Sequence, residues 1–213
     1  MFLFKSSAVA MLSSNTFILG LFAPLERVGW YAAGEKISRS CWQLLSPMTQ
    51  VLYPELARLT HFEAKRGRSM AIVCTLGTSL VGLALGLALY ISAPLAVRIL
   101  MGPAFMPSVA VLRMLAWLGP MVALNSAVAF YWLFPAGLEV PYTRLIISAM
   151  ILDILLNAVL APRFAETGTA LAVILAEITM LGGAALLLRA RMGSGRARLS
   201  GLDGLAISSQ GAD

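Results

Sequence analysis

An uncharged stretch from Ser69 to Val97 most constrains what this chain can fold into. It is rich in Leu, Ala and Gly, and it exceeds the ~20 apolar residues that an α-helix needs to cross the hydrocarbon core of a bilayer. Composition agrees, because hydrophobic residues make up 59% of the chain and charged residues only 12%, whereas soluble domains carry about a quarter charged residues. We therefore expect lipid, rather than water, to surround most of the protein.

Five further apolar segments indicate an all-α membrane protein with six transmembrane helices. The expected spans are residues 6–25, 30–54, 69–97, 112–135, 142–162 and 167–188. Turn residues such as Gly102-Pro103 and Ala161-Pro162 separate neighbouring spans. Residues 1–190 are thus expected to form one six-span bundle. Residues 191–213 are rich in Gly, Ser and Arg, which favours a disordered cytoplasmic tail.

The distribution of Lys and Arg between the loops predicts the orientation. One side of the membrane receives ten basic residues and the other side three. The first group is Lys5, Arg58, Lys65, Arg66, Arg68, Arg144, Arg189, Arg191, Arg196 and Arg198, and the second is Arg27, Arg98 and Arg163. Since positively charged loops stay in the cytoplasm, we expect a bacterial inner-membrane protein with both termini cytoplasmic.

Several function classes find no support in the sequence. The net charge of +6 is gathered in clumps that flank apolar spans, which is unlike the basic face of a nucleic-acid-binding domain. The chain has a single histidine, His61, and its two cysteines, Cys41 and Cys74, form no CxxC pair. No nucleotide-binding, hydrolase or metalloprotease motif occurs. We expect neither an enzyme nor a cofactor or metal site.

The second expected span carries a polar stripe. Lys36, Arg39, Gln43, Ser46 and Gln50 follow one another at helical spacing, so they share one helix face. This face could line a watery cavity that attracts an anionic group. It could instead be sealed against other helices, with Glu35 neutralising one of the two cations. Because Glu35 offsets only one positive charge, the pattern favours the cavity.

Polar residues in the last two expected spans form the second set of candidates, since charges inside a membrane are costly. Asp153 and Asn157 are four residues apart and share a helix face. They could bind a coupling ion or proton, or they could hydrogen-bond between helices to set the packing. Glu177 could likewise couple transport to protons, or it could pair with a basic residue on a neighbouring helix.

Six short segments carry a family resemblance. The run from Val28 to Arg39, VGWYAAGEKISR, is followed by Leu45-Ser-Pro47 and by LYPELARL from Leu52 to Leu59. Further along are LMGPAFMPSVAVLRML from Leu100 to Leu115 and DILLN from Asp153 to Asn157, the latter continuing to APRFAETGTA, which ends at Ala170. In order and spacing, these segments resemble Wzx-type polysaccharide flippases of the MOP transporter superfamily.

The resemblance implies a fold and a substrate. Such flippases have two bundles of six helices around a cationic central cavity, and they move undecaprenyl-pyrophosphate-linked oligosaccharides across the inner membrane. This chain resembles the C-terminal bundle, the C-lobe, of such a MOP/MATE-like transporter. The resemblance implies that Lys36 and Arg39 receive the pyrophosphate, with Gln43, Ser46 and Gln50 lining the same cavity.

The resemblance covers one bundle, so we expect either a truncated or split C-terminal half or a pairing of two copies. The partners implied are the lipid-linked oligosaccharide, membrane lipids and a missing N-terminal half or second copy. Two alternatives remain open. One is a MATE-like exporter of drugs or cations, which would use Asp153 and Glu177. The other is a non-transporting membrane component of a polysaccharide synthesis complex, or an inert fragment.

Overall fold

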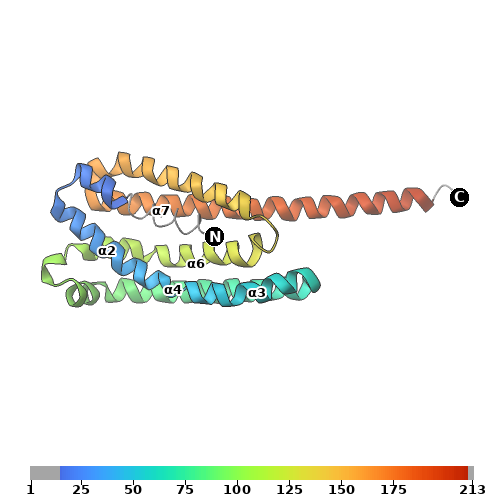
Figure 1. Cartoon of the computed structure of the whole chain (residues 1–213), viewed down its shortest axis with the longest axis horizontal. Coiled ribbons are helices and arrows are strands. Elements are labelled where there is room, and N and C mark those ends of the chain that lie inside the picture. The colour runs from blue at the N-terminus through green and yellow to red at the C-terminus, as the bar shows by residue number, and fades with distance from the viewer. Residues whose placement is uncertain (1–14, 211–213) are drawn as a thin grey trace.

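The structure is a computed structural model, which describes residues 15–210 and is helical nearly throughout that range (Figure 1). Residues 15–22 form a short helix. The remaining elements are α2 (Leu25–Gln43), α3 (Ser46–Phe62), α4 (Ala64–Leu100), the 3₁₀-helix η1 (Pro103–Phe105), α5 (Ser108–Ala116), α6 (Leu118–Val128), the π-helix η2 (Ala129–Leu133) and α7 (Glu139–Gln210). Within the described residues there is no β-strand, which confirms the all-α class.

Three helical segments in the described part are long and apolar enough to cross a membrane. They are Lys65–Leu100, Ser108–Leu133 and Glu139–Ala190. The first contains the uncharged run at 69–97, and the second joins α5, α6 and η2 and covers most of the expected span at 112–135. These segments identify a membrane protein. Residues 6–14 of the first expected span lie outside the described residues.

The expected span at 30–54 is divided into two helices. α2 ends at Gln43 and α3 begins at Ser46, because Pro47 has no backbone N–H to give to the carbonyl of Gln43. The chain tightens at this point, and the backbone N–H of Leu44 donates to the carbonyl of Cys41 at 3.2 Å. Neither helix is among the three candidate spans, since α2 carries too many charged residues and α3, with 17 residues, is too short.

α7 consists of two helical arms that fold back on one another. The reversal occurs at Ala165, whose φ of 49° and ψ of −127° interrupt the helix three residues after Pro162. Figure 1 shows the two arms side by side, in orange and red. Each arm covers one of the spans expected at 142–162 and 167–188. The hydroxyl of Thr169, just after the turn, donates to Oδ1 of Asn157 at 3.0 Å and joins the arms.

α4 and α6 make the most extensive helix contact, and small residues line it. A Cβ added at Gly82 would overlap the Cβ of Ala123, and one added at Gly86 would lie 2.8 Å from the carbonyl oxygen of Ala116. On the facing helix, Gly119 packs against the ring of Trp42 and lies near the carbonyl oxygen of Gly82. The Gly82–Gly86 pair thus packs within the bundle, as small-xxx-small motifs do.

The remaining core joins α2 to α5 and ties the far end together. Tyr31, Val111 and Leu115 are buried in one cluster that includes Leu19. At the opposite end of the molecule, edge-on aromatic contacts link Tyr53 of α3, Phe130 and Phe134 to Tyr142 of α7. The cluster that contains Leu19 and Tyr31 holds the residue 15–22 helix against α2, which positions the site described next.

The second arm of α7 is drawn as helix as far as Gln210, while side-chain surroundings are described only up to residue 190. Residues 211–213 lie outside the described range. The disordered tail expected at 191–213 therefore stays a prediction.

Candidate functional site

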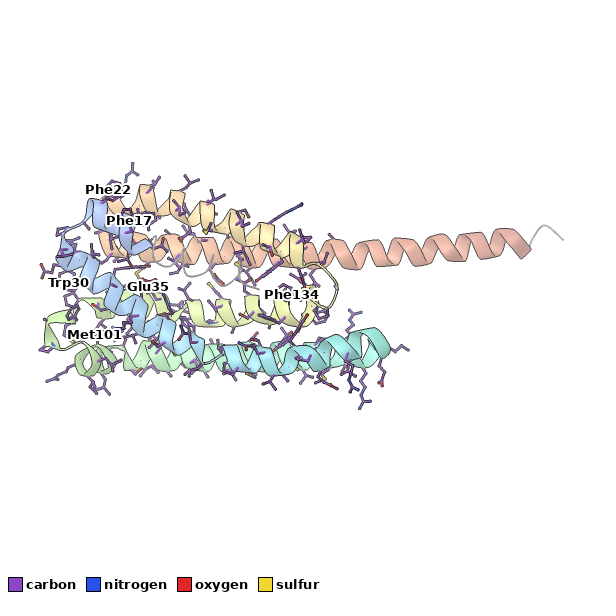
Figure 2. All side chains as sticks on the ribbon, in the orientation of Figure 1. Phe17, Phe22, Trp30, Glu35, Met101 and Phe134 are labelled. Carbon is purple, nitrogen blue, oxygen red and sulfur yellow. The ribbon has the colours of Figure 1, made fainter. Side chains whose placement is uncertain are left out.

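An open groove of about 520 Å³ lies between α2 and the residue 15–22 helix. Figure 2 shows Phe17 and Glu35, one from each wall, at the same end of the molecule and far from Phe134. The groove is lined by Thr16, Phe17, Ala32, Glu35, Lys36, Arg39 and Ser40. Two of the predicted site residues, Lys36 and Arg39, therefore share one concave surface with a carboxylate and two hydroxyls.

Glu35 and Arg39 are paired along the groove wall. The Arg39 guanidinium donates to Oε1 of Glu35 at 2.7 Å, and the hydroxyl of Thr16 donates to Oε2 of Glu35 at 3.1 Å. The Arg39 side chain is 37% exposed and the Glu35 side chain 13%. The pair is the i, i+4 arrangement that a helix favours, and Thr16 attaches it to the neighbouring helix. Nε of Arg39 is buried without a partner in the described structure.

Lys36 is the uncompensated charge of the groove. It is exposed, and among the described residues no acidic side chain lies within salt-bridge distance of its ammonium. Two cations and one carboxylate leave the groove with one net positive charge. An exposed ammonium with its three donors free to turn is well suited to contact a phosphate oxygen.

The glutamines of the predicted stripe are not found in the groove. Gln43 and Gln50 are exposed but do not line the groove, and the helix interruption at Leu44 and Leu45 separates Gln50 from α2. The Ser46 side chain lies outside the described residues. The structure thus brings together the cationic end of the stripe and leaves the amide end on a separate, exposed part of the same surface.

Asp153 and Asn157 meet in a fully buried polar network. Asn15 donates from Nδ2 to Oδ2 of Asp153 at 2.9 Å, and Asn157 donates from Nδ2 to Oδ1 of Asn15 at 3.1 Å. Thr169 completes the chain of bonds through its contact with Asn157. All four side chains are at most 1% exposed. Oδ1 of Asp153 is buried without a hydrogen-bond partner in the described structure.

Two of these network residues were not among the predicted site residues. Asn15 lies in a polar patch, Ser13 to Thr16, within the first expected span, and that patch was the available signal. Thr169 gave none, because a threonine after a turn is ordinary and only the reversal at Ala165 carries it to Asn157.

Glu177 has an amide partner instead of a basic one. Nδ2 of Asn125 donates to its Oε1 at 2.6 Å, and no basic side chain of the described residues forms an ion pair with it. Oδ1 of Asn125 is buried and unpartnered. Glu177 is therefore held separately from Asp153, between α6 and the second arm of α7.

A comparison with curated proteins finds the "Putative O-antigen transporter" of Escherichia coli (strain K12), which is 26% identical over 174 residues. The chain is related to Wzx-type flippases. This confirms the resemblance drawn from the sequence motifs. The match covers 81% of this chain but 42% of that transporter, so the chain spans about two fifths of the transporter's length.

Two other comparisons found no match. No protein-family model matches the chain, and no solved structure matches it.

Proposed function

We propose that this chain serves in the translocation of undecaprenyl-pyrophosphate-linked oligosaccharide across the bacterial inner membrane. The observation that supports this most is the exposed Lys36, which has no ion-pair partner among the described residues, in an open groove beside Arg39. A cation at this position is costly against lipid alone, and its cost falls when it faces water or an anionic ligand. The pyrophosphate of the carrier lipid is such a ligand.

In this mechanism the two cations have different tasks. Lys36 contacts the pyrophosphate directly, because its charge is not offset by a neighbour. Arg39 contributes electrostatic attraction and shapes the groove wall, since its guanidinium is already hydrogen-bonded to Glu35. Thr16 and Ser40 supply hydroxyls at the groove wall. The transported sugars extend away from these residues, and the groove is part of a larger cavity that a second bundle completes.

The arrangement in the membrane belongs to the same proposal. We infer six crossings, with both termini in the cytoplasm. Two crossings come from the arms of α7 before and after Ala165, two from α4 and from residues 108–133, and two from α2–α3 and the helix that contains residues 15–22. Each arm of α7 has about 25 residues within the Glu139–Ala190 span, which at ~1.5 Å per residue exceeds a ~30 Å hydrocarbon core.

The buried network around Asp153 is proposed as the coupling site. An ionised carboxylate that is buried with one amide donor and one empty oxygen is unfavourable by several kcal/mol. A proton on Asp153, or a cation beside its Oδ1, relieves that cost. The network joins the residue 15–22 helix to both arms of α7. A proton or cation bound at Asp153 can therefore change the position of the residue 15–22 helix, which forms one wall of the groove. Asn157 orients this site, while Glu177 is a separate candidate for proton coupling.

Substitution of Lys36 by Ala tests the proposed function. In cells whose surface polysaccharide depends on this chain, we expect Lys36→Ala to lower export about tenfold or more, because a hydrogen bond to a charged group contributes roughly 1.5–3 kcal/mol. The matched control is Lys65→Ala, which removes an exposed lysine from α4 outside the groove. Export by Lys36→Ala equal to that of Lys65→Ala, at equal membrane abundance, would refute the role of the groove.

A further inference from the structure

A small apolar crevice lies on the outer surface of the bundle, away from the groove. It has a volume of about 40 Å³ and is lined almost entirely by carbon. Gly86, Ala116 and Pro120 lack large side chains and form its floor, while exposed Tyr90 and Trp117 form its rim. This volume suits a short piece of a hydrocarbon chain.

A positive charge lies directly beside the crevice. Arg113 precedes Trp117 by one helical turn, and its guanidinium carbon lies 5.3 Å from the centre of the Tyr90 ring, as in a cation–π contact. The Arg113 residue is exposed, and no ion pair involves it among the described residues. The tyrosine ring therefore holds the guanidinium at the edge of the crevice without neutralising its charge.

The surrounding sequence leaves this charge uncompensated. From Ala64 to Leu138, a region that includes α4, α5 and α6, there is no aspartate or glutamate. α2 also packs on α5, but its Glu35 forms an ion pair with Arg39. Glu166 on α7 faces Arg27. Arg113 thus lacks the acidic partner that intramembrane cations usually have.

The depth of Arg113 fits a lipid headgroup. It lies five residues inside the candidate span Ser108–Leu133, about 8 Å from the start of that span along the helix axis. Arginine side chains extend toward the interface from such positions while their carbon stems stay in lipid. We therefore expect the guanidinium to reach headgroup level, beside the crevice.

We propose that Arg113, Tyr90 and Trp117 form a binding site for one anionic phospholipid. The lipid phosphate contacts the Arg113 guanidinium, and the first part of one acyl chain occupies the crevice between α4 and α6. This site is separate from the groove and does not depend on the proposed function. It would fix a lipid against the α4–α6 seam, the most extensive helix contact in the bundle.

Fluorescence quenching of Trp117 by brominated lipid tests this proposal. The full chain is reconstituted in phosphatidylcholine vesicles that contain a fixed fraction of brominated phosphatidylglycerol or brominated phosphatidylcholine. The Trp117 signal is the difference between the wild type and Trp117→Phe. From the quenching of Trp117, we expect brominated phosphatidylglycerol to bind the site about fivefold more tightly than brominated phosphatidylcholine. This is the preference that one basic residue near the surface confers.

Three variants separate the site from general surface attraction. Arg113→Gln is expected to bring the preference close to one, and Arg113→Lys to retain most of it. Arg98→Gln removes another exposed arginine, on α4 and outside the crevice, and is expected to leave the preference unchanged. Equal quenching by both lipids in the wild type, or an equal loss in Arg98→Gln and Arg113→Gln, would overturn the proposal.

Discussion

At the scale of single residues, the charges of this protein fall into two kinds. Arg39 and Glu35 neutralise one another along one turn of α2, and Thr16 anchors the pair to the adjacent helix. Lys36 and Asp153 lack a counter-charge among the described residues, one on the open surface of a groove and the other fully buried. Uncompensated charges are expensive in a membrane, so a functional role is the best explanation for these two residues, just as a bound lipid is for Arg113.

Replacement of Asp153 by Asn distinguishes coupling from packing. The variant keeps the shape of the side chain and removes a buried charge, so we expect its thermal stability in detergent to be unchanged or higher. Export should nevertheless fall about tenfold or more, because the site can no longer bind a proton or cation. Surface polysaccharide and thermal unfolding of the same variant provide the two measurements.

Glu166→Gln serves as the comparison for Asp153→Asn. It also removes a carboxylate from α7, but one that faces Arg27 at the end of the hairpin, outside the network. A stable Asp153→Asn protein that exports as well as Glu166→Gln would show that the network sets helix packing and has no part in coupling.

At the scale of helices, the α4–α6 seam sets how closely the bundle can pack. Gly119 leaves room for the ring of Trp42, and through Trp42 the seam reaches α2 and the groove wall. The indole nitrogen of Trp42 donates to the Ser38 hydroxyl at 2.7 Å, which holds the ring in this orientation. The seam therefore couples α2 to the core of the bundle.

Gly119→Ala tests the seam. The added methyl group would overlap the Trp42 ring and lie 3.0 Å from the carbonyl oxygen of Gly82, and overpacking of this kind typically costs about 1–3 kcal/mol. We expect a lower unfolding temperature in detergent. Gly77→Ala, also within a helix but with nothing within 4 Å of the new methyl group, should be neutral or slightly stabilising. Similar destabilisation by both variants would show that Gly119 is not closely packed.

The helices show where sequence patterns are informative and where they are not. The apolar run at 69–97 is sufficient to predict α4, because length and absence of charge decide a membrane helix. The same pattern predicts one helix over 30–54 and cannot reveal that Pro47 divides it, since prolines also occur in continuous membrane helices. The reversal at Ala165 has Pro162 nearby as a signal, but the turn itself is made by an alanine.

The sequence predicts those parts of the candidate site that lie on a single helix. Periodicity places Lys36 and Arg39 on one face, and the structure finds both in the groove. Periodicity also groups Asp153 with Asn157. It cannot supply Asn15 or Thr169, because these come from other helices and their contacts depend on tertiary packing.

At the scale of the whole molecule, the described bundle presents its polar stripe outward. Lys36, Gln43 and Gln50 are exposed, and so are many apolar side chains of α4. The chain spans 42% of the length of the O-antigen transporter that it matches. Under the function proposed above, the exposed polar residues are the surface that a second bundle would meet.

Thiol labelling measures directly whether water or lipid reaches Lys36, and we expect water. In a background with Cys41 and Cys74 replaced by Ser, a cysteine at Lys36 is treated in membrane vesicles with a membrane-impermeant maleimide. Leu80→Cys, 63% exposed in the middle of α4, reports on lipid. Lys65→Cys and Arg163→Cys report on the two sides of the membrane and should label from opposite sides if the six-crossing arrangement is correct. We expect rapid labelling at position 36, blocked by added lipid pyrophosphate, and almost none at position 80. Equal inertness of positions 36 and 80 from both sides of the membrane would contradict it.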